Sequence, residues 1–182
     1  MTVEWKKRIA IAAMVRQRIN ELDHSRLWPF HLPELAAKDD TLREVETKLG
    51  YALNRGYRDF LGCANGWQCF YQRVDLFGTG DLLGSTRMTN ALSLLDWIEP
   101  DVLHSAGVSQ DSLLPIAASF DDFTLFCISK PGSPSEGEVL WFSGKLVERF
   151  ANFEIFFLAM IDYNRIEVNT LTNGDKNDLA AD

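Results

Sequence analysis

Residues that build metal centres and nucleophilic sites are scarce in this sequence. Its 182 residues include three histidines and three cysteines. The histidines, at positions 24, 31 and 104, lack the HExxH spacing of a helical zinc site, and no two cysteines are spaced as CxxC. A Gly-x-Ser-x-Gly nucleophile elbow is also absent. We therefore expect no metal and no cofactor, and we predict that the protein is not an enzyme.

The three cysteines, Cys63, Cys69 and Cys127, are odd in number and fall in segments with the pattern of a helix end or a strand. This placement predicts reduced thiols and a cytoplasmic location. One catalytic alternative stays open, in which Cys69 and His104 act as nucleophile and base together with an aspartate. The sequence contexts of the known cysteine hydrolases are missing around both residues.

Long apolar runs and phosphate-binding glycine motifs are also missing. The most apolar segment, residues 150–161, contains Asn152 and Glu154 and is shorter than the roughly 20 residues that span a membrane, so no membrane association is expected. Residues 78–84 read GxGxxxG rather than GxGxxG, which predicts an irregular loop. Arg16 and Arg18 interrupt the N-terminal apolar residues too early for a secretion signal. An amphipathic helix is expected there instead, with an apolar face of Ile11, Val15, Ile19 and Leu22.

Residues 41–77 contain two helix patterns, a turn and a strand pattern. Thr41 and Glu44 form a capping box, and Gly50 can end the helix in the left-handed conformation. Asn54 can cap a second, short helix that stops at the turn pair Asn65-Gly66. Apolar residues recur at helical spacing in the two helices and at every second position in the strand: Leu42, Val45 and Leu49; Tyr57, Phe60 and Leu61; Trp67, Cys69 and Tyr71.

The second half of the chain has the pattern of an antiparallel meander. Four strand patterns follow at short spacing, at residues 113–118, 123–129, 138–142 and 145–150. The last two are joined by the two-residue turn Ser143-Gly144. Helices are expected at residues 90–98 and after Asn152. Trp67 and Trp141 lie in alternating patterns and are expected in the core. The predicted fold class is α+β, with a mixed, mainly antiparallel sheet of about five or six strands packed with helices.

The motif LG-x2-L-x3-Y-x2-FL-x3-NG, which begins at Leu49 and ends at Gly66, resembles the opening signature of the SUKH superfamily. The resemblance continues through Leu113–Ala117, residues 123–129, Gly137–Trp141 and the apolar helix pattern at 153–160. It covers roughly residues 40–162. The family usually has proline where this chain has Asn54, and both residue types can begin a helix.

The resemblance implies a SUKH-like fold and a protein-binding function. The superfamily contains bacterial immunity proteins, cytosolic antidotes that bind and block a toxin that is often a nuclease, and the fungal cell-wall assembly regulators. A protein that neutralises a cognate toxin is therefore implied. The alternative is an intracellular regulatory or interaction module without a toxin partner. Because the matching residues are packing and turn residues, no individual contact residue carries over.

One domain is expected in residues 1–163. It consists of an N-terminal helix and extended connection (1–38) and the family core (39–163). Residues 164–182 form a C-terminal segment that we expect to be disordered from Asn173, because it lacks apolar anchors from that point on. The oligomeric state stays open.

Negative charge is unevenly distributed along the chain, whose formal net charge is −8. Residues 1–38 have a net charge of +3, so residues 39–182 have −11, and positions 75–138 hold ten acidic residues against two basic ones. Clustered negative charge repels nucleic-acid phosphates and attracts basic protein surfaces. We therefore predict a protein partner, such as a basic toxin domain, and no direct nucleic-acid binding. Carboxylates that are merely solvated are the alternative. The candidate partner-binding residues are Asp75, Asp81, Asp96, Glu99, Asp101, Asp121, Asp122, Glu136 and Glu138.

The first helix pattern of the family core can be tested through Val45, the central residue of its apolar face. Val45→Asp should lower the free energy of unfolding by several kcal/mol, because it places an unpaired charge in the core. Thermal denaturation measures the effect. An unchanged melting temperature would show that this face is not buried.

Overall fold

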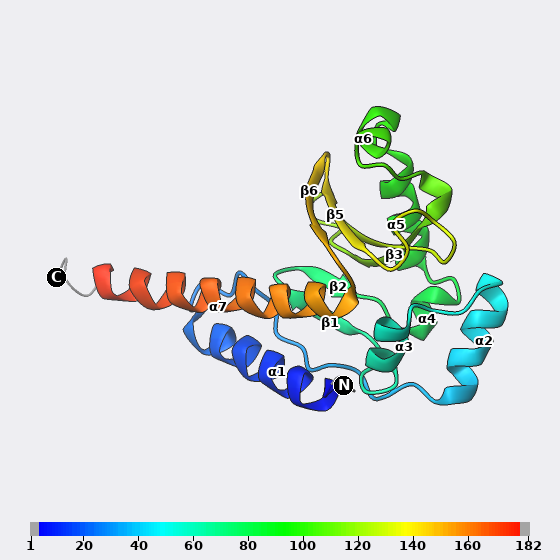
Figure 1. Ribbon diagram of the computed structural model, residues 1–182. Coiled ribbons are helices and arrows are strands. Elements are labelled where there is room, and N and C mark those ends of the chain that lie inside the picture. The colour runs from blue at the N-terminus through cyan, green and yellow to red at the C-terminus, as the bar shows by residue number, and fades with distance from the viewer. Residues whose placement is uncertain (1–3, 179–182) are drawn as a thin grey trace.

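The computed structural model describes the chain from Glu4 to Asp178, with side chains as far as Asn173. Its centre is a six-stranded sheet in the order β1-β2-β3-β4-β5-β6 (Figure 1). The strands are β1 (Trp67–Tyr71), β2 (Val74–Leu76), β3 (Leu113–Ala118), β4 (Thr124–Ser129), β5 (Val139–Ser143) and β6 (Leu146–Phe150). The helices are α1 (Trp5–Leu22), α2 (Asp39–Leu49), α3 (Arg55–Leu61), α4 (Thr79–Leu82), α5 (Thr86–Asp96), α6 (Pro100–Ser105) and α7 (Phe153–Asp178). The α+β class is confirmed.

Every pairing in the described sheet is antiparallel, so the expectation of a mixed sheet was wrong. Each strand pairs with the next one along the chain. Even the long connection from β2 to β3, which contains α4, α5 and α6, returns the chain antiparallel to the strand that it left. A parallel pair would need a crossover to the same end of the sheet, and the described chain has none.

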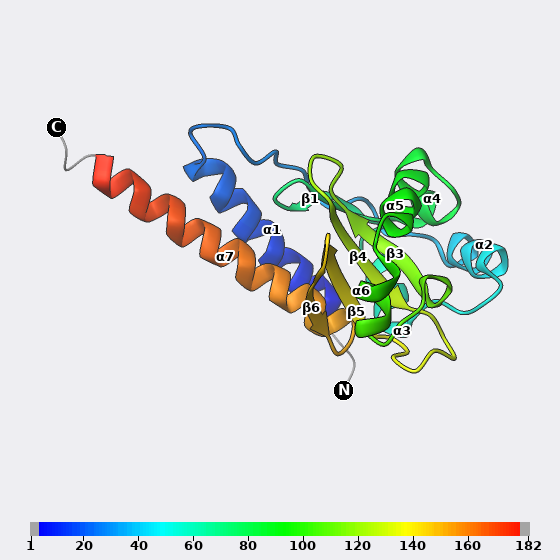
Figure 2. The same ribbon diagram turned by 90° about the horizontal axis from the view of Figure 1, so that it is seen from above.

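Helices lie on both faces of the sheet. α1 and α7 lie on one side and α5 and α6 on the other, as Figure 2 shows. Because both faces are covered, all residues of β3 and β4 are buried. Their sequences, LLPIAA and TLFCIS, accordingly lack the alternation of a strand with one wet face.

The first two helices of the family core form close to their predicted positions. The side chain of Asn54 caps α3 by accepting hydrogen bonds from the backbone N–H groups of Gly56 (3.0 Å) and Tyr57 (3.3 Å). α2 begins at Asp39 rather than at the predicted Thr41. The earlier start has an electrostatic reason, because Asp39 lies in the first turn, where negative charge is favourable. A hydrogen bond from Arg58 of α3 also lowers the pKa of Asp39.

α1 turns a different face to the core than the sequence suggested. Trp5, Ile9, Ala12, Arg16 and Ile19 are buried, whereas three members of the predicted face are only partly buried. The difference arises because the buried face was predicted from the spacing of apolar residues alone, and the buried face of α1 also contains an arginine. Arg16 is 1% exposed, and its guanidinium donates hydrogen bonds to the carbonyl of Pro29 (2.6 Å) and to Oδ1 of Asn164 (3.4 Å). Burial lowers its pKa.

α7 continues to Asp178, so the segment expected to be disordered from Asn173 is helical as far as the described chain reaches. The remaining residues, 179–182, lie outside the described part. The helix is anchored beyond the expected domain boundary at 163. Asn164, which is 3% exposed, donates to the carbonyl of Phe70 on β1 (3.0 Å), and Glu167 accepts from the indole of Trp28 (3.1 Å). These bonds make the start of the C-terminal segment part of the domain.

Asn164 joins α1, β1 and α7, so its removal should destabilise the fold. Asn164→Ala removes one hydrogen bond of the buried Arg16 and one of the carbonyl of Phe70, which should cost about 1–3 kcal/mol in free energy of unfolding. The exposed Asn169 on the same helix is the control, and Asn169→Ala should change stability by about 0.5 kcal/mol or less. Chemical denaturation of both variants measures the difference. Equal effects would mean that this buried network does not stabilise the fold.

Candidate protein-binding surface

The nine acidic candidates fall into three separate groups in the structure. Asp75 and Asp81 form the first group, around Arg87 at the start of α5. The Arg87 guanidinium lies 3.0 Å from Oδ1 of Asp81 and 3.2 Å from Oδ2 of Asp75. Asp81 is 3% exposed and also accepts from the backbone N–H of Gly78. These two carboxylates tie β2, α4 and α5 together, so Asp81 is not available on the surface.

Glu136 and Glu138 form the second group, in the connection between β4 and β5. Glu136 accepts from the backbone N–H of Gly132 at 2.8 Å, and Glu138 pairs with Arg149 of β6 at 3.1 Å. This connection leaves the end of β4 at Ser129, whereas the β3–β4 turn precedes its start at Thr124. A six-residue strand of roughly 20 Å therefore separates this group from the turn.

The third group consists of Asp96, Glu99 and Asp101 near the ends of α5 and α6, and Asp121 and Asp122 in the β3–β4 turn. All five are exposed. The two segments meet through a ring contact between Trp97 and Phe123, whose centroids are 5.9 Å apart. We call this set the aromatic–acidic surface: Trp97, Phe120, Phe123, Asp96, Glu99, Asp101, Asp121 and Asp122.

Its aromatic side chains are unusually exposed: 71% for Trp97, 60% for Phe123 and 42% for Phe120. Local structure explains this exposure. Leu95 faces the sheet at the end of α5, and two residues later the helix has turned by about 200°, so Trp97 points away from the sheet. Phe123 stands in the turn just before β4, where Asp122 accepts from the backbone N–H of Thr124 at 2.9 Å.

The surface is strongly negative. From Met88 to Ser129 the chain contains six acidic residues and no lysine or arginine. A basic side chain from elsewhere pairs with this surface: Arg73, in the β1–β2 turn, donates to Oδ2 of Asp121 at 2.9 Å. The two turns therefore lie side by side at one end of the sheet (Figure 2). Asp96, by contrast, accepts from the neutral side chain of Gln110.

Five of the nine acidic candidates predicted from the sequence lie on this surface, but the sequence analysis did not single out its exposed aromatic side chains. It placed Trp97 in an apolar helix and Phe123 in a strand. The available signal was the sequence Phe-Asp-Asp-Phe at 120–123, because two acidic residues between two aromatic ones suit an exposed turn better than a buried strand. Of the two tryptophans expected in the core, Trp67 is 1% exposed, while Trp141 is only partly buried and stacks on Phe126 at 5.1 Å.

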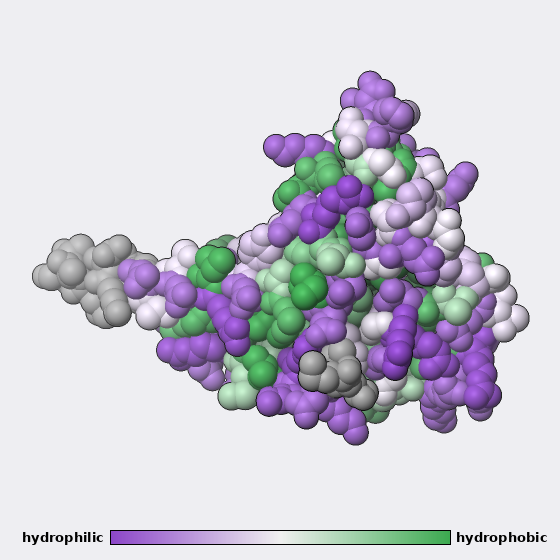
Figure 3. Space-filling model, viewed as in Figure 1, coloured by the Kyte–Doolittle hydropathy of each residue, from purple (hydrophilic) through white to green (hydrophobic). Residues whose placement is uncertain are grey.

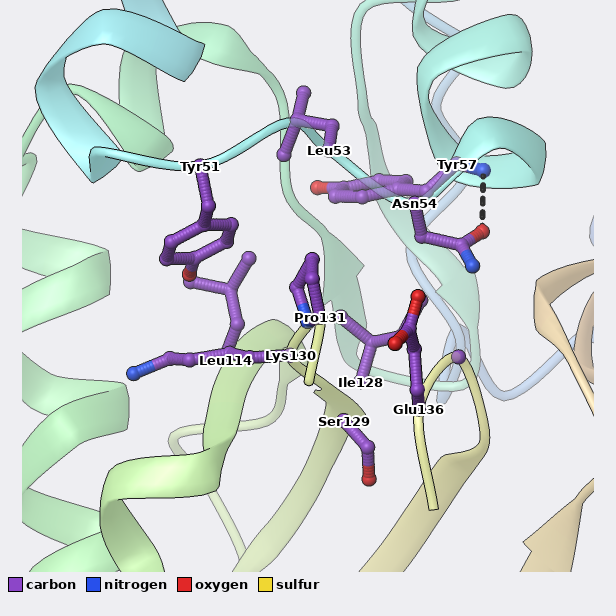
Figure 4. A pocket seen from close by; sticks show the side chains of 11 residues that line it. Tyr51, Leu53, Asn54, Tyr57, Leu114, Ile128, Ser129, Lys130, Pro131 and Glu136 are labelled. Atoms are coloured by element: carbon purple, nitrogen blue, oxygen red, sulfur yellow. Dashed lines mark hydrogen bonds between the residues drawn. The ribbon is translucent and has the colours of Figure 1, made fainter. Parts of the chain in front are cut away.

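A small hollow lies between the α2–α3 connection and the β4–β5 connection (Figure 4). Its volume of about 20 Å³ has room for roughly one water molecule. Two of the polar side chains around it are engaged elsewhere: Asn54 caps α3, and Lys130 donates to the carbonyl of Asp111 at 2.9 Å. The Tyr51 side chain is partly buried, which raises its pKa to about 12. At this volume the hollow is too small to hold a substrate.

The described residues bear on three other possibilities: a cysteine nucleophile, a metal site and a membrane span. Burial and the charge of Asp75 raise the pKa of Cys69, the opposite of what a thiolate nucleophile needs. No described cluster of His, Cys, Asp or Glu is suited to hold a metal ion. None of the described helices combines the length and apolar character needed to cross a membrane.

A further apolar area is visible where α7 passes beneath β5 and β6 (Figure 3). The exposed apolar side chains of these elements include Val147, Ile155 and Ile166. Charged side chains are interspersed among them, such as the ion pair of Arg165 with Asp162 at 2.7 Å. This area lacks an exposed aromatic pair, so it is a weaker candidate for partner recognition.

A known protein family matches most of this sequence. The model of the SMI1 / KNR4 family (SUKH-1) matches residues 36–159, more than half of the chain. No curated protein matches the chain significantly. The matched range begins before α2 and ends within α7, so it contains the whole sheet and the aromatic–acidic surface but leaves out α1.

The exposure of Trp97 predicts that it contributes little to stability. Trp97→Ala should lower the free energy of unfolding by about 1 kcal/mol or less, because the side chain loses only one exposed ring contact. Trp67→Ala is the matched comparison and should cost about 3–5 kcal/mol, because that indole is buried and bonded to the carbonyl of His31. Denaturation curves for both variants decide the matter. A large loss for Trp97→Ala would assign this side chain to the core.

Proposed function

The chain belongs to the SMI1 / KNR4 family (SUKH-1), and we propose that it is a non-catalytic protein-binding domain whose aromatic–acidic surface docks onto a basic surface of a partner protein. The observation that carries this proposal is the exposed ring pair of Trp97 and Phe123, which lies among five exposed carboxylates.

This composition suits protein recognition. Tryptophan is among the residue types that contribute most binding energy at the centre of protein interfaces, because it loses a large apolar area to the partner. Carboxylates around such a centre steer a basic partner toward it and repel acidic ones. The same charges disfavour direct contact with nucleic-acid phosphates. Each part of the surface therefore has a distinct role in selecting a basic protein.

The form of this function that we favour is neutralisation of a basic toxin domain in the cytoplasm. A toxin that acts on nucleic acid needs a basic cleft, and an acidic inhibitor can occupy such a cleft in place of the substrate. The alternative is a regulatory or interaction module without a toxin partner. The product of the neighbouring reading frame separates the two: an antidote should bind it and suppress its activity, whereas a regulator should not.

The raised pKa of Cys69 supports a binding role over one catalytic alternative, because a thiolate nucleophile at that position would need a lowered pKa.

The electrostatic part of the proposal predicts that association is sensitive to salt and to charge reversal in the β3–β4 turn. Raising the ionic strength from 0.1 M to 1 M shortens the screening length from about 10 Å to about 3 Å, so association should slow markedly while dissociation changes less. At a fixed ionic strength, the double variant Asp121→Lys and Asp122→Lys should associate more slowly than the unmodified protein. Surface plasmon resonance against the product of the neighbouring reading frame measures both rates.

Two controls make this test specific. The double variant Asp40→Lys and Glu44→Lys changes net charge equally on the exposed side of α2, away from the proposed interface. The double variant Asp175→Lys and Asp178→Lys changes the net charge by the same amount in the C-terminal segment. If either control slows association as much as the turn variant, or if salt has no effect, the carboxylates of the turn are ordinary solvated groups.

A further inference from the structure

One carboxylate of the aromatic–acidic surface, that of Asp121, is already paired with a cationic side chain of the same chain. Nη1 of Arg73 lies 2.9 Å from Oδ2 of Asp121, and both side chains are about half exposed, at 49% and 60%. Exposed ion pairs of this kind contribute little to stability, so this one is easily exchanged. The pairing of Arg87 differs, because its guanidinium contacts two carboxylates that are 18% and 4% exposed.

The β1–β2 turn places Arg73 at this position through a backbone conformation that most residues avoid. Gln72 has a φ of +48°, and Cys69 has a φ of +50° at the irregularity in β1. Residues other than glycine adopt such angles only when their surroundings enforce them. Here Asp75 accepts from the backbone N–H of Cys69 at 2.9 Å. The hairpin is therefore built so that Arg73 extends toward the β3–β4 turn.

We propose that Arg73 is an internal competitor for the partner's cation: in the complex, a guanidinium or ammonium group of the partner replaces Arg73 on Asp121, beside the rings of Phe123 and Trp97. The inference rests on the proposed function and specifies the chemical group that this surface receives. Asp121 offers a carboxylate that accepts a guanidinium, and the adjacent exposed rings offer faces on which a cation is attracted. Arg73 then lowers the affinity for weakly basic partners. It favours partners that position a cationic group directly against the carboxylate of Asp121.

The test uses a fluorescently labelled arginine-rich peptide as the probe and fluorescence anisotropy as the readout. Arg73→Gln should bind the peptide about fivefold more tightly than the unmodified protein, because an exposed ion pair no longer competes. Arg165→Gln is the matched control, since it removes an equivalent exposed ion pair on α7 and the same charge. It should change affinity by less than about twofold. Unchanged melting temperatures verify that both variants are folded.

A double-mutant cycle separates competition from a general gain of negative charge. Under competition, Asp121→Asn changes affinity little when Arg73 is present, because the carboxylate that it removes is already occupied. In the Arg73→Gln background the same change should weaken binding about fivefold. Equal effects of Asp121→Asn in the two backgrounds, or equal gains from Arg73→Gln and Arg165→Gln, would overturn the role of Arg73.

Failure of the proposed function gives a different result. If the peptide does not bind, or if Trp97→Ala and Asp122→Lys leave its affinity unchanged, then the aromatic–acidic surface does not receive cations. In that case both the surface and the inference are rejected. If those two variants weaken binding while the cycle shows no coupling, only the inference about Arg73 is rejected.

Discussion

Aromatic packing around the start of α7 is the interaction on which the rest of the structure depends. The ring of Phe153 lies 4.9 Å from that of Tyr57, 5.4 Å from that of Phe60 and 5.5 Å from that of Trp5. One side chain thus joins α1, α3 and α7. One turn further along α7, Phe156 contacts Phe126 at the centre of the sheet and Phe150 at its edge. This packing covers one face of the sheet and leaves the opposite face to α5.

The position of the candidate surface follows from that arrangement. Because α5 must cover the other face, its apolar residues Met88, Ala91 and Leu95 turn inward. The residue after its last turn, Trp97, then points outward beside the β3–β4 turn. No residue of the surface is needed for the core, which explains how it can be aromatic, acidic and exposed at the same time. Packing in the core fixes where the residues of this surface lie, and it does not restrict which side chains they carry.

Burial separates the roles of carboxylates that look alike in the sequence. Asp81, 3% exposed and paired with Arg87, stabilises the junction of α4 and α5. Asp121, whose side chain is 60% exposed, keeps an ion pair that can be exchanged. A buried carboxylate whose partner is removed leaves an uncompensated charge, whereas an exposed one is solvated. The same residue type is therefore structural in one place and available for binding in another.

The sequence by itself determined the local features of the fold. The cap at Asn54, the strand patterns and the apolar residues of α7 depend on neighbours within a few positions, so their spacing predicts them, and the SUKH resemblance followed from the same packing and turn residues. The tertiary structure alone decided which acidic residues share a surface. Trp97 and Phe123 are 26 positions apart, and the Arg16–Asn164 and Arg73–Asp121 pairs are still further apart in the chain. Long-range contacts of this kind depend on how whole elements pack, and the periodicity of residues along one element contains no information about them.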